Sequence, residues 1–144
     1  MTTASEDTYA ILTLLYRYAE MLDEGDFAGV ATLFVDADII VGDTVTGHGS
    51  DHVETMLHAM VRIHHDHTPR TRHLITNPII EFDGPDHAFA RSCYTVLQPR
   101  GDRIDIVATG RHHDTFQRHH DRWKYSSRDY SYLDYAGDTT AHLL

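Results

Sequence analysis

The sequence predicts an α+β fold in which a curved, mostly antiparallel sheet wraps around N-terminal helices and encloses an apolar pocket. In the first third of the chain, apolar residues recur at three- and four-residue spacing, as they do in amphipathic helices. After Pro69 the pattern changes to that of strands, and turn-forming residues separate four long segments. Helices followed by a run of consecutive strands are typical of the α+β class.

The N-terminal part is expected to contain three helices and two short strands. The expected helices are 6–26, 26–34 and 51–67, and the expected strands are 37–42 and 44–49. Ser5 or Asp7 can cap the first helix, Gly25 follows its end, and Ser50 can cap the third. The residues expected to face inward are Ile11, Leu14, Leu15, Tyr18, Ala19, Leu22, Phe27, Val30, Leu33, Phe34, Val53, Met56, Leu57, Met60 and Ile63.

The four long strands are expected to form an antiparallel meander. Their expected ranges are 71–84, 86–101, 102–121 and 122–135. Apolar pairs break the clean alternation of a half-exposed sheet, at Leu74–Ile75, Ile79–Ile80 and Ile106–Val107. Both faces of the sheet are therefore expected to be partly covered. Helices can cover one face, and a second copy of the chain can cover the other, so we expect a homo-oligomer.

Composition and charge are those of a soluble single-domain protein, and they exclude several functions. The 144 residues form one expected domain, 1–144, with a formal net charge of −10. This charge argues against nucleic acid and anionic membranes as partners, because both attract basic surfaces. The single cysteine, Cys93, excludes an internal disulfide, and no apolar run reaches the ~18 residues of a transmembrane helix. The N-terminus lacks the features of a signal peptide, so a cytoplasmic location is expected.

Asp23 and His73 are candidates for a proton-transfer pair. Asp23 lies at the C-terminal end of the first helix, where the helix dipole disfavours a carboxylate. His73 stands at the head of an apolar strand, and imidazole can accept and return a proton near neutral pH. A carboxylate on its other ring nitrogen would fix the tautomer. The alternatives are a solvated acid at the helix end and a histidine satisfied by hydrogen bonds in the core.

Arg128 is the third candidate, as a group that stabilises a developing anion or a leaving group. Strand alternation predicts that Ser126, Arg128 and Tyr130 share one face and that Trp123 and Tyr125 lie on the other. An arginine that faces a pocket can stabilise an enolate or a departing anion. The alternative is a surface cation paired with one of the many acidic residues.

Metal and cofactor sites are not expected. The histidine-rich runs are 64–67 and 111–114. Adjacent histidines on a strand point to opposite faces and cannot easily hold one ion. The first run is expected at a helix end, where histidines suit the exposed carbonyl groups. No phosphate-binding glycine loop, nucleophile elbow or HExxH motif occurs, and Cys93 is expected to face away from Tyr94 and Gln98.

Three stretches of the chain resemble the SnoaL-like branch of the nuclear-transport-factor-2-like superfamily, over residues 6–132. They are "YRYAEMLDEGDFAGVATLF", "TRHLITNPIIEFDGPDHAFARSCY" and "GRHHDTFQRHHDRWKYSSRDY". The resemblance implies a cone-shaped α+β barrel with a deep apolar pocket. In the dehydratase and dehydrochlorinase members it implies that Asp23 and His73 remove a proton and that Arg128 assists the leaving group. Dimers and trimers both occur in the superfamily, and a dimer is the first expectation here.

The resemblance also supplies the expected pocket wall and shows where the chain departs from the dehydratase pattern. Strand parity and position in the family indicate that the wall contains Tyr18, Phe27, Tyr94, Gln98, His112 and Tyr130. Scytalone dehydratase has a second histidine where this chain has Gln98, and a serine and an asparagine where this chain has Asp114 and Phe116. Scytalone itself is therefore a doubtful substrate.

Two classes of function remain after the sequence has been considered. The first is a cofactor-independent lyase, dehydratase-like, or an isomerase, acting on a small apolar molecule, with cyclic and aromatic compounds as candidates. The second is a non-catalytic domain that binds a small ligand or serves as the small subunit of a ring-hydroxylating dioxygenase. The presence of both Asp23 and His73 favours the enzyme, because a structural subunit needs no buried proton-transfer pair.

Overall fold

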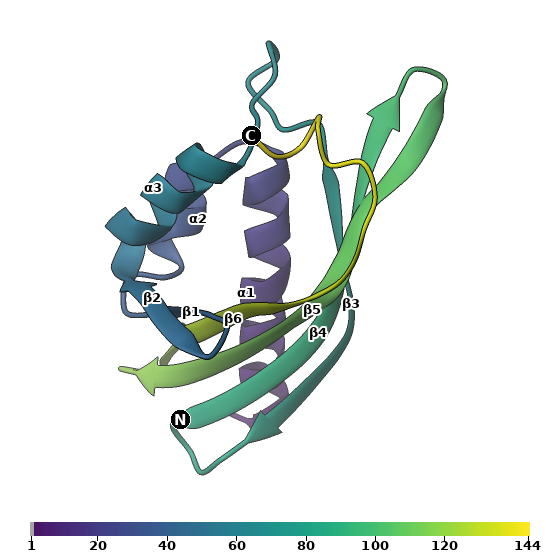
Figure 1. Ribbon diagram of the computed structural model, residues 1–144. Helices are drawn as coiled ribbons and strands as arrows, with labels where there is room; N and C mark the ends of the chain where they lie inside the picture. The colour runs from purple at the N-terminus through teal and green to yellow at the C-terminus, as the bar shows by residue number, and fades with distance from the viewer. Residues whose placement is uncertain (1) are drawn as a thin grey trace.

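The computed structural model describes residues 2–144 and has the expected α+β architecture, with a curved sheet around α1 (Figure 1). The elements are α1 (Ala4–Asp23), α2 (Phe27–Thr32), β1 (Asp38–Val41), β2 (Thr44–His48), α3 (Gly49–Met60), β3 (Arg72–Phe82), β4 (His87–Arg100), β5 (Arg103–His119) and β6 (Arg122–Ala136). None of the helices within residues 2–144 is both long and apolar enough to cross a membrane.

One six-stranded sheet runs in the order β2-β1-β6-β5-β4-β3 and is not closed into a barrel. The meander from β3 to β6 is antiparallel, as expected. β1 adds to β6 in parallel, with Ile39 opposite Arg128, so the sheet is mixed. This parallel pair joins segments that are distant in sequence, and no local sequence pattern predicted it.

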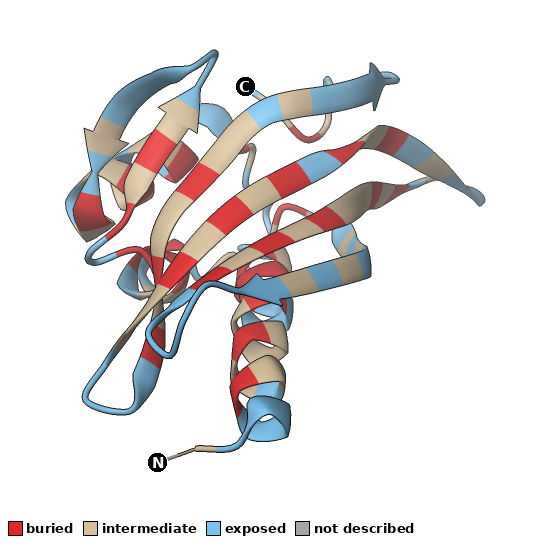
Figure 2. Cartoon of the chain, turned by 90° about the horizontal axis from the view of Figure 1, so that it is seen from below, coloured by how far each residue is buried: buried red, intermediate tan, exposed pale blue. Residues whose placement is uncertain are grey.

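The hydrophobic core lies between the inner face of the sheet and the helices. α1 contributes Ile11, Leu15 and Leu22, which are buried against inward residues of the strands such as Phe116 and Tyr125. Figure 2 shows the buried residues as bands that alternate along the strands with less buried ones. Each large apolar side chain that is buried in this way stabilises the fold by about 1.5–3 kcal/mol.

A β-bulge in β3 explains why the alternation of that strand is broken. The register with β4 shifts between Thr76 and Ile79, and Asn77 has a φ of 52°, in the left-handed region that asparagine tolerates. The bulge lets Ile75 and Ile80 both pack against the core. Their neighbours Leu74 and Ile79 lie on the outer face, 39% and 47% exposed.

A second bulge, in β6, reverses the faces that simple alternation predicted. The register with β5 shifts between Thr115 and Phe116, which lie opposite Ser127 and Tyr125. The Thr115 hydroxyl hydrogen-bonds both Ser126 and Ser127, at 2.7 and 2.6 Å. Because of the extra residue, Tyr125 and Arg128 contact one another, and the predicted separation of Trp123 and Tyr125 from Arg128 is wrong.

The predicted cap of the first helix is also wrong. Thr3 caps α1, and a capping box links it to Glu6. Ser5 and Asp7 lie inside the helix. Asp7 is largely buried, and its carboxylate accepts a hydrogen bond from Trp123 Nε1 at 3.0 Å.

The third helix starts and ends earlier than predicted. It starts at Gly49 with His48 as the preceding cap residue, so Ser50 lies within it. It ends at Met60, and Val61 takes up an extended conformation and pairs with Leu143 near the C-terminus. The run 64–67 is therefore a loop. Met60 and Ile63, which were expected to face inward, are exposed.

Candidate active site

A cavity of about 320 Å³ lies between α1, α3 and the inner face of the sheet. Tyr18, Tyr94, His112 and Tyr130, four of the six expected wall residues, line it together with His73. Most of the remaining lining is aliphatic. A largely apolar cavity with a few convergent polar groups is the usual form of a site for a small molecule.

Asp23 and His73 are in direct contact, as the sequence predicted. The Asp23 Oδ1 atom lies 2.6 Å from His73 Nδ1, and Oδ2 accepts a hydrogen bond from the His73 backbone N–H at 2.9 Å. The Thr71 hydroxyl donates to Oδ1 at 2.8 Å. These three bonds offset the unfavourable position of a carboxylate at the C-terminal end of α1.

The contact determines which nitrogen of His73 is available for chemistry. An ionised carboxylate only accepts hydrogen bonds, so Nδ1 carries the proton. In the neutral ring Nε2 is then unprotonated and can accept a proton. The His73 side chain is 7% exposed and forms part of the cavity lining. The ring is thus oriented by Asp23 at Nδ1 and belongs to the lining of the cavity.

The tyrosine wall of the cavity contains Tyr18, Tyr94 and Tyr130 together with His112. The hydroxyls of Tyr18 and Tyr130 lie 3.2 Å apart and share a hydrogen bond. The His112 ring stacks on Tyr94, with ring centroids 4.5 Å apart. Two causes raise the pKa of Tyr130 well above its ordinary value: burial is the larger and the neighbouring Tyr18 is the smaller. The hydroxyl of Tyr130 therefore stays protonated. The pKa of His112 is lowered well below its ordinary value, mainly by burial and next by the charge of Arg128. The ring of His112 is therefore neutral.

Arg128 is buried behind this wall and is not part of the cavity lining. Its Nε and Nη2 atoms donate to the two carboxylate oxygens of Asp114 at 2.8 and 3.0 Å. Its guanidinium carbon lies 4.2 Å from the centre of the Tyr18 ring. Arg128 therefore does not face the cavity as expected and instead contacts the ring of Tyr18, because the bulge in β6 and the pairing with Asp114 turn the side chain into the core.

Two of the expected wall residues lie elsewhere. Phe27 is buried in the core, where its ring meets His58 edge to face. Gln98 is buried at the far end of β4, and its amide donates to the backbone carbonyls of Pro69 and Ala141 at 3.0 and 2.9 Å. Both are buried, as predicted, but neither lines the cavity: Phe27 contacts His58 of α3 and Gln98 contacts the C-terminal segment.

One further cavity residue, His142, was not indicated by the sequence. It lies in the C-terminal segment, and its ring meets that of His73 at a centroid distance of 5.7 Å. The segment has no periodicity and no motif, so only its contacts identify the residue. Within residues 2–144, no three His, Cys, Asp or Glu side chains gather as a metal site would require.

An open α+β cone with an inner cavity and a His–Asp pair at its edge defines the class of this protein. The sequence profile of the SnoaL-like domain matches residues 3–129. The chain therefore belongs to the SnoaL-like family, and the resemblance noted from its sequence is confirmed. No curated protein matches the chain.

Several solved structures share the fold at low sequence identity. An NTF2-like protein with a cystatin-like fold from Novosphingobium aromaticivorans has a TM-score of 0.73 and 22% identity, over 94% of this chain and 86% of that one. A candidate scytalone dehydratase from the same organism has a TM-score of 0.70 and 21% identity, over 92% and 87%. The beta subunit of a candidate aromatic-ring-hydroxylating dioxygenase, also from this organism, has a TM-score of 0.68 and 23% identity, over 96% and 97%. These likenesses establish the fold.

Proposed function

We propose that the protein is a cofactor-independent lyase, dehydratase-like, or an isomerase that acts on a small, largely apolar molecule. The observation that carries the proposal is the Asp23–His73 contact of 2.6 Å at the edge of the cavity. A histidine held in one tautomer by a carboxylate is a general base, and its unprotonated nitrogen can take a proton from carbon. Asp23 orients the ring and stabilises the imidazolium that forms.

The cavity supports a small substrate with cyclic or aromatic character. Its volume of about 320 Å³ lies at the low end of the range for ligand pockets, roughly 300–1,000 Å³. The rings of Tyr18, Tyr94 and Tyr130 offer flat apolar surfaces for a ring compound.

The tyrosine wall supports dehydration as the first choice of reaction. One of the paired hydroxyls of Tyr18 and Tyr130 donates to the other, which leaves one O–H free to donate to a departing hydroxyl or to a developing anion. Arg128 strengthens this wall as a positioning residue, because its charge lies against the Tyr18 ring without touching the ligand. An isomerase would use the same base and would return the proton to another carbon of the substrate.

A ligand-binding or structural role is the second candidate, and one observation favours it. The chain matches the beta subunit of the dioxygenase-like protein over nearly the full length of both chains. A subunit of that kind would co-purify with a large iron-containing partner, whereas the proposed enzyme would purify and act alone. The His–Asp contact beside the cavity favours the enzyme.

The proposal can be tested with two cyclic ketones that report on proton abstraction. Exchange of the α-protons of 2-tetralone in D₂O can be followed by NMR, and loss of water from 3-hydroxycyclohexanone can be followed by the absorbance of the enone. We expect the protein to accelerate at least one of these reactions. His73→Ala should then lower the rate roughly 10²–10⁴-fold, which is the usual contribution of a general base.

A matched variant separates chemistry from stability. His87 is an exposed histidine at the start of β4, and His87→Ala should keep the rate and the melting temperature of the parent protein. If His73→Ala keeps the full rate but melts at a lower temperature, His73 is a structural residue. Failure of the parent protein to accelerate either reaction would overturn the proposed function.

A further inference from the structure

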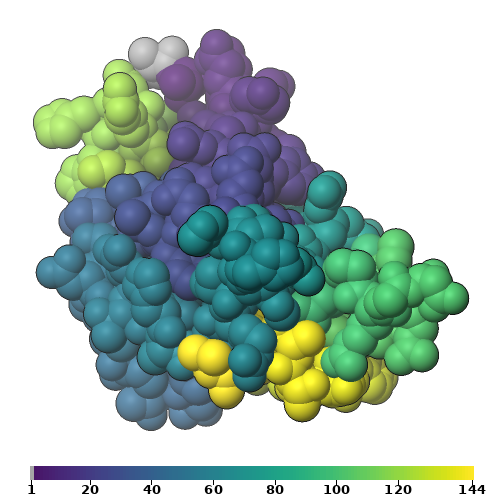
Figure 3. Space-filling view, turned by 90° about the horizontal axis from the view of Figure 1, so that it is seen from above, coloured from purple at the N-terminus to yellow at the C-terminus, as the bar shows by residue number. Residues whose placement is uncertain are grey.

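The C-terminal strap, which we define as residues 137–144, closes one side of the cavity. It follows β6 and returns across the sheet to the end of α3 (Figure 1). Figure 3 shows the yellow C-terminal residues at the surface between the teal segment that follows α3 and the green β4–β5 turn. Thr139, His142 and Leu143 of the strap line the cavity.

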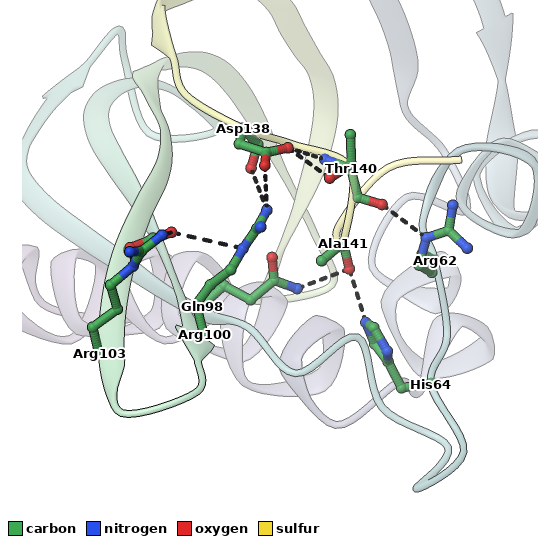
Figure 4. A network of polar contacts seen from close by, with 9 residues as sticks. Arg62, His64, Gln98, Arg100, Arg103, Asp138, Thr140 and Ala141 are labelled. Carbon is green, nitrogen blue, oxygen red and sulfur yellow. Dashed lines mark hydrogen bonds and ion pairs between the residues drawn. The ribbon is translucent and has the colours of Figure 1, made fainter.

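The strap is held mainly through its own backbone (Figure 4). The contacts are Arg62 Nε to Thr140 O at 3.0 Å, His64 Nε2 to Ala141 O at 2.8 Å, Gln98 Nε2 to Ala141 O at 2.9 Å, Arg62 N to His142 O at 2.8 Å and Leu144 N to Met60 O at 2.9 Å. None of them uses the side chain of His142. The strap can therefore keep its place when that side chain is changed.

The start of the strap is fixed by an ion pair. Asp138 lies 2.9 Å from Arg100 and accepts hydrogen bonds from the hydroxyl and the backbone N–H of Thr140 at 2.6 and 3.0 Å. The pKa of Asp138 is lowered to about 2, mainly by the two hydrogen bonds from Thr140 and to a smaller extent by Arg100. The carboxylate stays ionised at neutral pH, and the strap is anchored at both ends.

The ring of His142 is buried and has an unused polar atom. The residue is 7% exposed, and its Nδ1 atom has no hydrogen-bond partner within residues 2–144. A buried polar atom without a partner typically costs about 1–3 kcal/mol of stability. Such an atom beside a cavity, and next to the His73 ring at 5.7 Å, has the position of a group that binds a ligand.

We propose that His142 is a second catalytic residue, which donates a hydrogen bond to a carbonyl oxygen next to the carbon that His73 deprotonates. This inference rests on the proposed function and narrows its substrate class to enolisable ketones, with β-hydroxy ketones as the dehydration substrates. The two rings are close enough for adjacent atoms of one small ligand to reach both.

The reaction that follows is balanced without a further reagent. His73 Nε2 takes the α-proton as the C–H bond breaks, and the electron pair of that bond forms the enolate. The negative charge develops on the oxygen that His142 binds. When the carbonyl forms again, the β-hydroxyl leaves, takes the proton from His73 and departs as water, which gives an unsaturated ketone.

The protonation state of His142 is compatible with this role. The pKa of His142 is lowered to about 4, mainly by burial and to a smaller extent by the neighbouring His73, although Asp23 acts in the opposite direction. The ring is neutral at pH 7 and does not oppose the positive charge that His73 gains. Triosephosphate isomerase provides a precedent, because a neutral histidine polarises a substrate carbonyl there.

His112 is less suited to this role, although it is also buried and its Nδ1 atom also lacks a partner within residues 2–144. Its ring is stacked on Tyr94 and meets Tyr18 and Tyr130 edge to face. It thus belongs to the tyrosine wall, whereas His142 is the residue whose ring packs against His73.

The test combines the rate of α-proton exchange with the infrared spectrum of bound 2-tetralone carrying ¹³C at its carbonyl. We expect the carbonyl stretch to move to lower frequency in the parent protein and to return towards its value in an apolar solvent in His142→Leu. The exchange rate should fall roughly 10²–10³-fold, as it does when one donor to an oxyanion is removed. His142→Gln keeps an N–H donor and should restore part of both effects, and His87→Gln should change neither.

The outcomes separate this inference from the proposed function. If the parent protein accelerates exchange and His142→Leu matches it in rate and carbonyl frequency, the role of His142 is wrong and the base His73 stands. If His142→Leu does not fold, His142→Gln decides, because it keeps an N–H donor at this position. An exchange rate equal to that of the ketone without protein, together with a carbonyl frequency equal to that of the unbound ketone, would then exclude a donor role. If the parent protein accelerates neither exchange nor dehydration, the proposed function fails and this inference fails with it.

Discussion

Arg128 and Asp114 form a two-point ion pair that is completely shielded from solvent, and this pair supports the wall of the candidate site. Burial alone would lower the pKa of Arg128, but Asp114 raises it well above its ordinary value, so the guanidinium stays charged. Burial raises the pKa of Asp114, and the two bonds from Arg128 oppose that rise. The positively charged guanidinium group of Arg128 lies directly behind Tyr18.

Removal of one partner of this pair should strongly destabilise the protein. Asp114→Asn keeps the shape of the side chain but leaves the Arg128 charge buried without a counter-ion, which typically costs about 3–5 kcal/mol. Urea unfolding followed by circular dichroism would measure the loss. Arg103, in an exposed pair with Asp105, is the control, and Arg103→Ala should cost less than about 1 kcal/mol. Equal losses of unfolding free energy in Asp114→Asn and Arg103→Ala would contradict the conclusion that the buried Asp114–Arg128 pair supports the fold.

Arg128→Lys should also be damaging, although the charge is conserved. The ammonium group cannot reproduce the planar fork that binds both oxygens of Asp114. We expect a lower free energy of unfolding and, in the exchange assay with 2-tetralone, a lower rate because Tyr18 loses its support. A variant that folds with parental stability and turns over at the parental rate would show that the planar fork of Arg128 is not required.

Asp23→Asn should reduce proton abstraction sharply without a change in the size of the side chain. The amide of asparagine can place its N–H₂ group against His73 Nδ1, which favours the wrong tautomer. We expect the exchange rate to fall roughly 10²–10⁴-fold, and ¹⁵N NMR of the ring to report the altered tautomer. Glu24 is the neighbouring exposed acid, and Glu24→Gln should leave both readouts unchanged. A normal tautomer combined with a full rate in Asp23→Asn would remove Asp23 from the mechanism.

The protein should lose stability as the pH falls from 6.5 to 4. The pKa of His142 is about 4 in the folded state, against an ordinary value of 6.5, so the unfolded chain binds more protons in this interval. The contribution is fully present above pH 6.5 and is lost as the pH falls through the folded pKa. The lowered pKa of His112 acts in the same direction. Each pKa unit corresponds to about 1.4 kcal/mol.

Melting temperatures across this pH range would check the prediction. The slope of stability against pH should be flatter in His142→Leu than in the parent protein. His87→Gln, which changes an exposed histidine, should keep the parental slope. Equal slopes in all three proteins would show that His142 is not held neutral by burial.

The protein should form a homo-oligomer through the outer face of the sheet, as a dimer first and a trimer second. Leu74 and Ile79 lie on that face, 39% and 47% exposed in the single chain, and exposed apolar patches often mark interfaces. Sedimentation at micromolar concentration would measure the mass. Leu74→Arg should shift the equilibrium towards the monomer, whereas a parent protein that is monomeric at this concentration would contradict the prediction.

The secondary structure could largely be predicted because its signals are local. Apolar spacing revealed α1, and alternation with turn residues revealed the four long strands. The boundaries that were wrong depend on distant partners. α3 ends at Met60 because Val61 pairs with Leu143, a residue about 80 positions further along the chain.

The candidate site was predictable where residue chemistry and local position agree. Asp23 is disfavoured at its helix end and His73 is unusual at the head of an apolar strand, and the two side chains proved to be in contact. Phe27 and Gln98 were assigned to the cavity by parity and by position in the family, which indicate that a residue points inward but not what covers it.

The sequence by itself therefore determined the fold class and the order of the elements, because periodicity acts over short distances, and it marked Asp23 and His73 as candidates by residue type and local position. Their contact, between residues 50 positions apart, was decided by the tertiary structure. Only the tertiary structure decided that Arg128 lies behind Tyr18 and that His142 lies beside His73. The first depends on one extra residue in β6, which reverses the faces of the strand that follows it. The second depends on hydrogen bonds between the strap and segments far away in the sequence, for which the strap carries no local signal.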